Sequence, residues 1–196
     1  DRLYRLLERE GLSLDESDRV VLYLAKLLPE KGADRILELV RETDDRLPDD
    51  VTFVFVGEFR DEEYEREVRT LHREVSDRVL LYSKRVAYKA VPSIVNAADA
   101  VVLFSEAMTE GAPRILQESL AMGTPVVASD VAGISDSFGG LSGVYLVDRD
   151  DPEQFLEAVT SATDPPGATD REAYRDRFDM TRNYRAYADI YASLGE

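Results

Sequence analysis

The sequence predicts an α/β fold, namely a Rossmann-like, doubly wound parallel sheet of about six strands with further helices at the C-terminal end. Three observations predict it. Short runs of consecutive apolar residues recur along the chain, and segments with helical apolar periodicity separate them. Glycine and proline mark several of the junctions. Uninterrupted apolar strands that alternate with amphipathic helices are typical of a parallel sheet covered on both faces.

The first half of the chain is expected to supply three strands, at 20–24, 51–56 and 79–82. Two amphipathic helices lie between them, with apolar faces formed by Ala33, Ile36, Leu37 and Val40 and by Tyr64, Val68, Leu71 and Val75. A helix is also expected over 1–11, before the first strand, and a short one within 88–97, after the third.

The second half is expected to supply strands at 100–104, 126–128 and 144–147. Pro113 is predicted to open the helix after the first of these, because a proline lacks the N–H that would be unpaired at the first helical position. A short helical turn is expected near Ile134. Asp151 as N-cap and Pro152 at the first helical position predict the last helix of this half, with Phe155, Leu156 and Val159 facing inward. By analogy with the doubly wound fold, the expected strand order is 3-2-1-4-5-6.

A chain of 196 residues is expected to form one domain with a substantial core. Residues 163–196 begin with a loop that contains Pro-Pro-Gly at 165–167, and after it they are predicted to form C-terminal helices that carry several aromatic side chains. Two interpretations stay open for these aromatics. They pack on the sheet, or they mark the interface with another domain.

The chain is strongly acidic, with 40 Asp and Glu against 24 Lys and Arg and a formal net charge of −16. It has no basic stripe, so no nucleic-acid partner is expected, and no apolar run long enough for a membrane-spanning segment. It also has no cysteine, which excludes disulfides and thiolate metal sites. Two interpretations of the charge stay open: an ordinary acidic enzyme, or a protein of a halophile whose surface carboxylates remain hydrated in molar salt.

The most informative segment is 110–128, which reads EGAPRILQESLAMGTPVVA. Glu110 and Glu118 flank a Gly-Ala-Pro turn and the start of a helix. The first turn of a helix offers unpaired N–H groups and the positive end of the helix dipole, which suit a phosphate. Carboxylates at the same place would repel a phosphate, so they are expected to accept hydrogen bonds from hydroxyl groups. A ligand that carries both phosphates and hydroxyls is a sugar nucleotide.

This Glu-x7-Glu segment resembles the donor site of retaining glycosyltransferases of the group 1 type, which have the GT-B fold. Four further segments are similar to the family's pattern and occur in its order: AKLLPEKG (25–32), NAADAVVLFS (96–105), SDVAGISD (129–136) and GVYLVDRDDPEQF (143–155). The resemblance implies that residues 1–196 are the C-terminal, nucleotide-sugar-binding lobe of a GT-B enzyme. It also implies that the N-terminal acceptor lobe is absent here and that 163–196 can pack against it.

The resemblance implies roles for individual residues. Lys26 and Lys31 are directed at the donor diphosphate, with Lys26 standing where the family has arginine. Glu110 accepts hydrogen bonds from the transferred sugar and Glu118 from the ribose. These two lysines and Glu110 are the expected catalytic residues.

The remaining expected donor-binding residues act largely through their backbone. Arg114 and Ile115 would supply N–H groups to the phosphates. The other expected contacts are the glycine that closes the second strand, the turn before the helix and two residues that hold the base: Gly57, Gly111, Ala112, Pro113, Arg85 and Val86. No metal ligand is assigned, and Asp148 and Asp150 are interpreted as part of a turn that leads to the Asp151 cap.

The implied function is transfer of a sugar from a UDP- or GDP-sugar to an unknown acceptor, with retention and without a metal or other cofactor. The expected location is the cytoplasm, and the chain alone is expected to be inactive because its partner lobe is missing. Two alternatives stay open. One is a stand-alone sugar-nucleotide-binding or regulatory module, and the other is a GT-B relative such as an epimerase or phosphorylase.

Overall fold

The computed structural model describes residues 2–75, 78–106, 111–164, 169–182, 184–185 and 191. Within them, six parallel strands form one sheet in the order β3-β2-β1-β4-β5-β6, with the bounds β1 Arg19–Leu24, β2 Val51–Val56, β3 Val79–Tyr82, β4 Ala100–Leu103, β5 Val126–Ser129 and β6 Val144–Val147. This confirms the predicted fold class and strand order.

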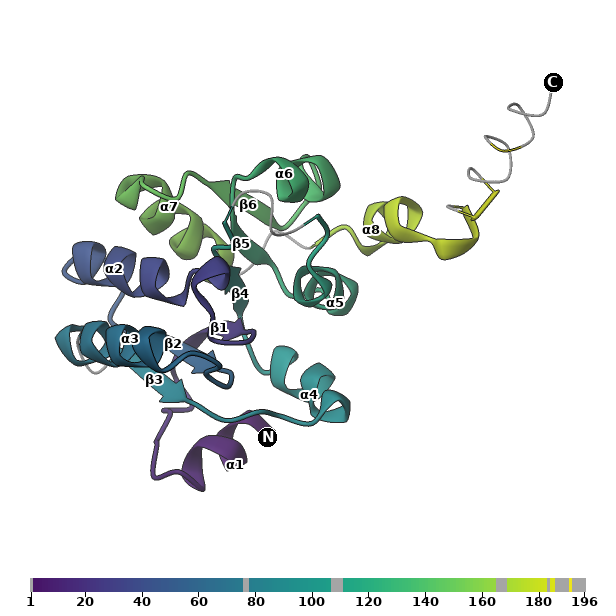
Figure 1. Ribbon diagram of the computed structural model, residues 1–196. Helices are drawn as coiled ribbons and strands as arrows, with labels where there is room; N and C mark the ends of the chain where they lie inside the picture. The colour runs from purple at the N-terminus through teal and green to yellow at the C-terminus, as the bar shows by residue number, and fades with distance from the viewer. Residues whose placement is uncertain are drawn as a thin grey trace.

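Helices cover both faces of this sheet (Figure 1). The helices α2 (Ala33–Thr43), α3 (Glu62–Glu74) and α7 (Pro152–Thr163) pack side by side on one face. The other face carries α1 (Arg2–Glu8), α4 (Val91–Val95) and α5 (Arg114–Met122), whereas α6 (Ala132–Phe138) connects β5 to β6. Because both faces are covered, every residue of β2, β4 and β5 is buried.

The helix faces predicted from periodicity point into the core. Ala33, Ile36, Leu37 and Val40 are all buried on α2. Phe155 on α7 is fully buried and reaches two strands, with ring centroids 6.1 Å from Phe53 of β2 and 5.7 Å from Phe104 at the end of β4. Burial of one such ring stabilises a fold by about 1.5–3 kcal/mol. The predicted cap is also present, since the Asp151 carboxylate accepts hydrogen bonds from the N–H groups of Glu153 and Gln154.

Two predicted boundaries differ in detail. Helix α5 begins at Arg114, so Pro113 is its N-cap rather than its first helical residue, with an extended ψ of 127°. The short helix expected within 88–97 is divided into a 3-10 helix, η2 (Tyr88–Ala90), and the α-helix α4. Pro92 lies in the first turn of α4, where its missing N–H costs no hydrogen bond.

The C-terminal region packs on the sheet domain as far as α8 (Arg171–Phe178). Phe178 lies 5.2 Å from Phe138 of α6, ring centroid to ring centroid, and 5.0 Å from Tyr174. Beyond α8, Met180, Tyr184 and Tyr191 are exposed. The other aromatic and apolar side chains predicted for this end, at 187, 190 and 194, lie outside the described residues. A bilayer-spanning helix does not occur in the part of the chain that the structure describes.

Candidate functional site

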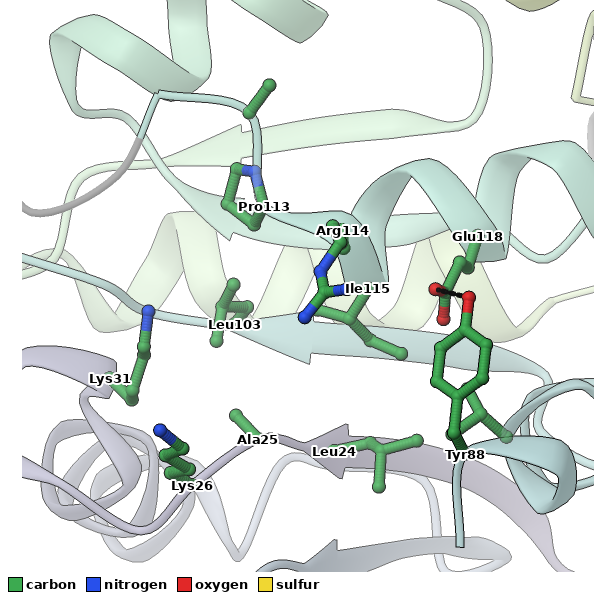
Figure 2. A pocket seen from close by; sticks show the side chains of 12 residues that line it. Leu24, Ala25, Lys26, Lys31, Tyr88, Leu103, Pro113, Arg114, Ile115 and Glu118 are labelled. Atoms are coloured by element: carbon green, nitrogen blue, oxygen red, sulfur yellow. Dashed lines mark hydrogen bonds between the residues drawn. The ribbon is translucent and has the colours of Figure 1, made fainter.

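A pocket of about 420 Å³ opens at the carboxyl ends of β1 and β4, where a doubly wound sheet binds its ligands (Figure 2). Its lining comes from the end of β1 and the loop after it, from β4, from the segment around η2, and from the start of α5. The lining residues are Leu24, Ala25, Lys26, Lys31, Tyr88, Val91, Leu103, Ala112, Pro113, Arg114, Ile115 and Glu118. Seven of the twelve were predicted as site residues.

Lys26 is placed by the pairing of the loops after β1 and β2. The N–H of Leu27 donates to the carbonyl of Glu58 at 3.0 Å. Gly57 is required at this crossing, because a Cβ there would lie 1.9 Å from the carbonyl oxygen of Ala25. The fully buried Tyr23 adds a further contact, since its hydroxyl donates a hydrogen bond to the carbonyl of Lys26 at 3.1 Å. The main chain around Lys26 is therefore fixed, while its side chain is exposed toward the pocket.

Lys31 is placed by a second close approach. It ends the 3-10 helix η1 (Pro29–Lys31), and Gly32 follows with φ +66°. A Cβ on Gly32 would lie 2.0 Å from the carbonyl oxygen of Phe104, just beyond β4. The N–H of Glu106 also donates to the carbonyl of Glu30 at 3.0 Å, so the turn is joined to the loop after β4.

Lys31 is half-buried. Burial lowers its pKa, the nearby charge of Lys26 acts in the same direction, and Glu30 opposes the shift. Figure 2 shows both amines directed into the same end of the pocket. Two neighbouring ammonium groups, of which Lys31 is partly desolvated, favour an anionic ligand, because a negative charge stabilises the partly buried cation and offsets the mutual repulsion.

The start of α5 forms the opposite wall. The carbonyl of Pro113 accepts from the N–H groups of Leu116 at 3.1 Å and Gln117 at 3.3 Å. The N–H groups of Arg114 and Ile115 precede these bonds and belong to the unpaired donors of a helix start. The Arg114 side chain is exposed and extends over the pocket between the lysines and Glu118 (Figure 2).

Glu118 lies one turn further along α5, at the end of the pocket away from the lysines (Figure 2). Its Oε1 accepts a hydrogen bond at 3.3 Å from the hydroxyl of Tyr88, which lies on η2. Tyr88 was not predicted as a site residue. A signal for it is present in the sequence, since it is an aromatic residue in the segment that leaves β3 at the ligand-binding edge. Its partner is 30 positions away, however, and only the folded structure brings the two together.

The residues predicted to hold the base line a second hollow of about 280 Å³. Gly57, Arg85 and Val86 belong to it, together with Glu58 and Arg60. The two hollows share Leu24, Ala25 and Lys26, so they adjoin across the end of β1.

Three expectations remain to be placed. Glu110 lies outside the described residues, so its predicted role stays a prediction. Gly111 is exposed just before α5, and its carbonyl accepts from the hydroxyl of Ser137 at 3.1 Å. Asp148 and Asp150 form a turn, in which the N–H of Asp150 donates to Asp148 Oδ1 at 3.0 Å. The described residues contain no group of three or more His, Asp or Glu side chains arranged to hold a metal ion.

The pattern of the family described as "Glycosyl transferases group 1" matches residues 5–178, which include the sheet, both hollows and α8. The chain belongs to this family. The predicted family is therefore confirmed, while the role of the Glu-x7-Glu spacing stays a prediction.

Relatives of this group 1 glycosyltransferase domain include the D-inositol 3-phosphate glycosyltransferase of Salinispora tropica, 28% identical over 199 residues that cover 95% of this chain and 41% of the relative. The trehalose synthase of Pyrococcus horikoshii is 24% identical over 203 residues, covering 98% and 48%. The crystal structure of Anabaena HepE in complex with UDP-glucose is similar with a TM-score of 0.71 and 20% identity, covering 98% of this chain and 52% of that one. At this identity, the likeness to HepE shows the fold.

The chain spans about half the length of the curated relatives it matches, with coverage of 45%, 48% and 41% of the first three. The family match therefore covers one part of such an enzyme, and the activity of the whole protein is proposed below.

Proposed function

We propose that this chain is the donor-binding lobe of a retaining, metal-independent glycosyltransferase that takes its sugar from a UDP- or GDP-sugar. An N-terminal lobe of the same protein would bind the acceptor, and the cytoplasm would be its location. The observation that carries the proposal is one pocket with two chemically different ends. Lys26, Lys31 and Arg114 form a cationic end, and Glu118 forms a hydroxyl-accepting end.

The cationic end suits the diphosphate. In a chain with a net charge of −16, three cationic side chains gather around one hollow together with the start of a helix. When the sugar–phosphate bond breaks, negative charge develops on the diphosphate. Preorganised ammonium groups and backbone N–H donors stabilise that charge more than they stabilise the substrate, which is the requirement for catalysis. In this proposal the lysines and the α5 start do the work that a metal ion does in other transferases.

The other end suits the nucleoside. Glu118 would accept a hydrogen bond from the ribose, and the adjoining hollow with Arg85 and Val86 would take the base. Glu110 would accept from the transferred sugar. The fold shared with HepE, whose structure contains UDP-glucose, supports a ligand of this class. A site that binds hydroxyls with a half-buried carboxylate is selective, because an unpaired carboxylate is costly.

Isothermal titration calorimetry on the 196-residue chain tests the proposal. We expect UDP or GDP to bind with an affinity no tighter than micromolar, because only half of the cleft is supplied, and the affinity to be unchanged by EDTA. Glu118→Gln should weaken binding by about tenfold or more, the loss of one hydrogen bond to a charged group. No sugar transfer is expected from the chain alone. Folded protein that gives no heat with either nucleotide would refute the donor site, and turnover by the chain alone would refute the division into lobes.

A halophilic origin is also part of the proposal, and thermal unfolding in salt tests it. We expect the Tm to rise steadily from low salt to molar KCl. Ion pairs such as Arg19–Asp50 (2.6 Å) and Arg46–Glu153 (2.6 Å) weaken on screening, but exposed pairs contribute only about 0–1 kcal/mol each. Relief of repulsion within a −16 chain outweighs that loss.

The shape of the salt curve separates the two interpretations of the charge. Charges more than about 8 Å apart are largely screened near 0.15 M salt, and shielding of the repulsion is expected to saturate by roughly a few tenths molar. A rise that continues well beyond this concentration supports halophilic hydration of the carboxylates. A curve that is flat or falls above it indicates an ordinary acidic protein.

A further inference from the structure

We infer that Tyr88 is a positioning residue of the nucleotide site: its hydroxyl orients the Glu118 carboxylate for the ribose, and its ring forms the wall against which the nucleoside packs. This inference rests on the proposed function and adds to it a residue that was not among the site residues predicted from the sequence. It concerns the end of the pocket opposite the lysines (Figure 2).

The first observation is the hydrogen bond. The Tyr88 hydroxyl donates to Glu118 Oε1 at 3.3 Å, from η2 on one side of the pocket to α5 on the other. A glutamate side chain has several rotatable bonds, and a hydrogen bond to one carboxylate oxygen restricts them. The second oxygen, Oε2, is then available as the acceptor for a ribose hydroxyl. A carboxylate that is oriented before the ligand arrives has less conformational freedom to lose on binding.

The second observation is exposure. Tyr88 is 72% exposed, although its ring lines the pocket and faces Ile115 (Figure 2). The other large exposed apolar side chains of the described residues, Met180, Tyr184 and Tyr191, all lie beyond α8. Of these four exposed side chains of the described residues, only Tyr88 lines the pocket between β1 and α5. An aromatic face in that position is covered when a nucleoside stacks or packs on it.

Glu118 has a second tyrosine neighbour, which provides a matched control. Tyr174 of α8 is close enough that the Glu118 charge, after burial, contributes to raising the Tyr174 pKa. Tyr174 packs its ring on Phe178 rather than into the pocket. If any tyrosine hydroxyl near Glu118 influenced nucleotide binding, Tyr174→Phe would also change the affinity. In the proposed role only the Tyr88 hydroxyl orients the carboxylate, so Tyr174→Phe should leave the affinity unchanged.

Calorimetry on the full chain with three probes tests the inference: UDP, GDP and inorganic pyrophosphate, which has neither ribose nor base. Tyr88→Phe should weaken binding of the nucleotide about fivefold and Tyr88→Ala about tenfold or more, by loss of one hydrogen bond and then of the ring contact. Pyrophosphate should bind all variants equally, because it needs only the cationic end. Tyr174→Phe should match the parent chain with every probe. Since Tyr88 is exposed, unchanged melting curves are expected for both of its variants.

A double-mutant cycle decides whether the hydroxyl acts through Glu118. Adding Tyr88→Phe to Glu118→Gln should produce almost no further loss of nucleotide affinity, because an oriented carboxylate no longer exists. Additive losses would overturn the inference. So would equal losses for nucleotide and pyrophosphate, or tighter nucleotide binding in Tyr88→Phe, which would mean that the hydroxyl blocks Glu118. If the Tyr88 variants bind normally while Glu118→Gln is impaired, the inference is wrong and the donor site stands. If the parent chain binds neither nucleotide, the proposed function is wrong and the inference falls with it.

Discussion

Loss of both pocket lysines should abolish measurable binding of UDP and GDP. Each of Lys26→Ala and Lys31→Ala removes a charge-assisted contact to the diphosphate, and one such contact contributes about 1.5–3 kcal/mol, or roughly 10- to 150-fold in affinity. Calorimetry or competition binding measures the effect, with pyrophosphate as a second probe that should be affected equally. Lys89→Ala is the matched control, because Lys89 is an exposed lysine on η2 that does not line either hollow.

The pH dependence of binding should show which lysine is partly desolvated. Burial lowers the pKa of Lys31, so this group loses its charge at a lower pH than an ordinary lysine. Only the protonated form attracts the diphosphate, so affinity should be highest at neutral pH and decline as the pH rises through the lowered pKa of Lys31. In Lys31→Ala that alkaline decline should move to higher pH.

The assignment of the cationic end has two possible contradictions. One is nucleotide affinity that survives when both Lys26 and Lys31 are replaced, and the other is an equal loss of affinity in Lys89→Ala.

Gly32→Ala should be the most destabilising single-methyl substitution in the site. The new Cβ would lie 2.0 Å from the Phe104 carbonyl oxygen, and Gly32 has φ +66°. The left-handed conformation alone costs a non-glycine residue about 1–2 kcal/mol. Displacement of either backbone segment adds to this, so we expect a loss of about 3 kcal/mol or more in the free energy of unfolding, measured with urea.

Gly140→Ala separates the two contributions. Gly140 has φ +78°, but in the described structure a Cβ there would have no neighbour within 4 Å. Its substitution should therefore show the conformational cost without the steric one and should destabilise by only about 1–2 kcal/mol. If Gly32→Ala and Gly140→Ala have equal effects, the close approach of Gly32 to the end of β4 is not a tight contact in solution.

Local sequence signals were sufficient for most of the fold. The bounds of β3 and β6 agree with the apolar runs that predicted them, and the Asp151–Pro152 pair marked the start of α7. These signals are short-range, and each acts within one turn or one strand. Pro113 was placed one residue too far into α5, because proline is also compatible with the extended conformation of an N-cap.

The candidate site was predictable where it follows strand ends and less so where it depends on packing. Parallel strands place their carboxyl ends at one edge, so Lys26, Lys31 and the α5 start could be expected to meet there. The Tyr88–Glu118 contact could not be, because it depends on how η2 and α5 pack across the edge. Nor could the sequence show that Gly57 is needed for the approach of two backbones, since its neighbour, the Ala25 carbonyl, lies in the loop after β1.

The two glycine contacts have a consequence for the thermodynamics of ligand capture. The turns that carry Lys26 and Lys31 are held by main-chain contacts to the segments that follow β2 and β4. Their backbone entropy is lost when the domain folds, before any anion arrives. Capture of a diphosphate then has to immobilise only the flexible lysine stems, at about 0.5–1.5 kcal/mol for each side chain. In the proposed function, the cationic end would thus be fixed in its backbone and adaptable at its side-chain ends, so that the same two turns could hold phosphates in somewhat different positions.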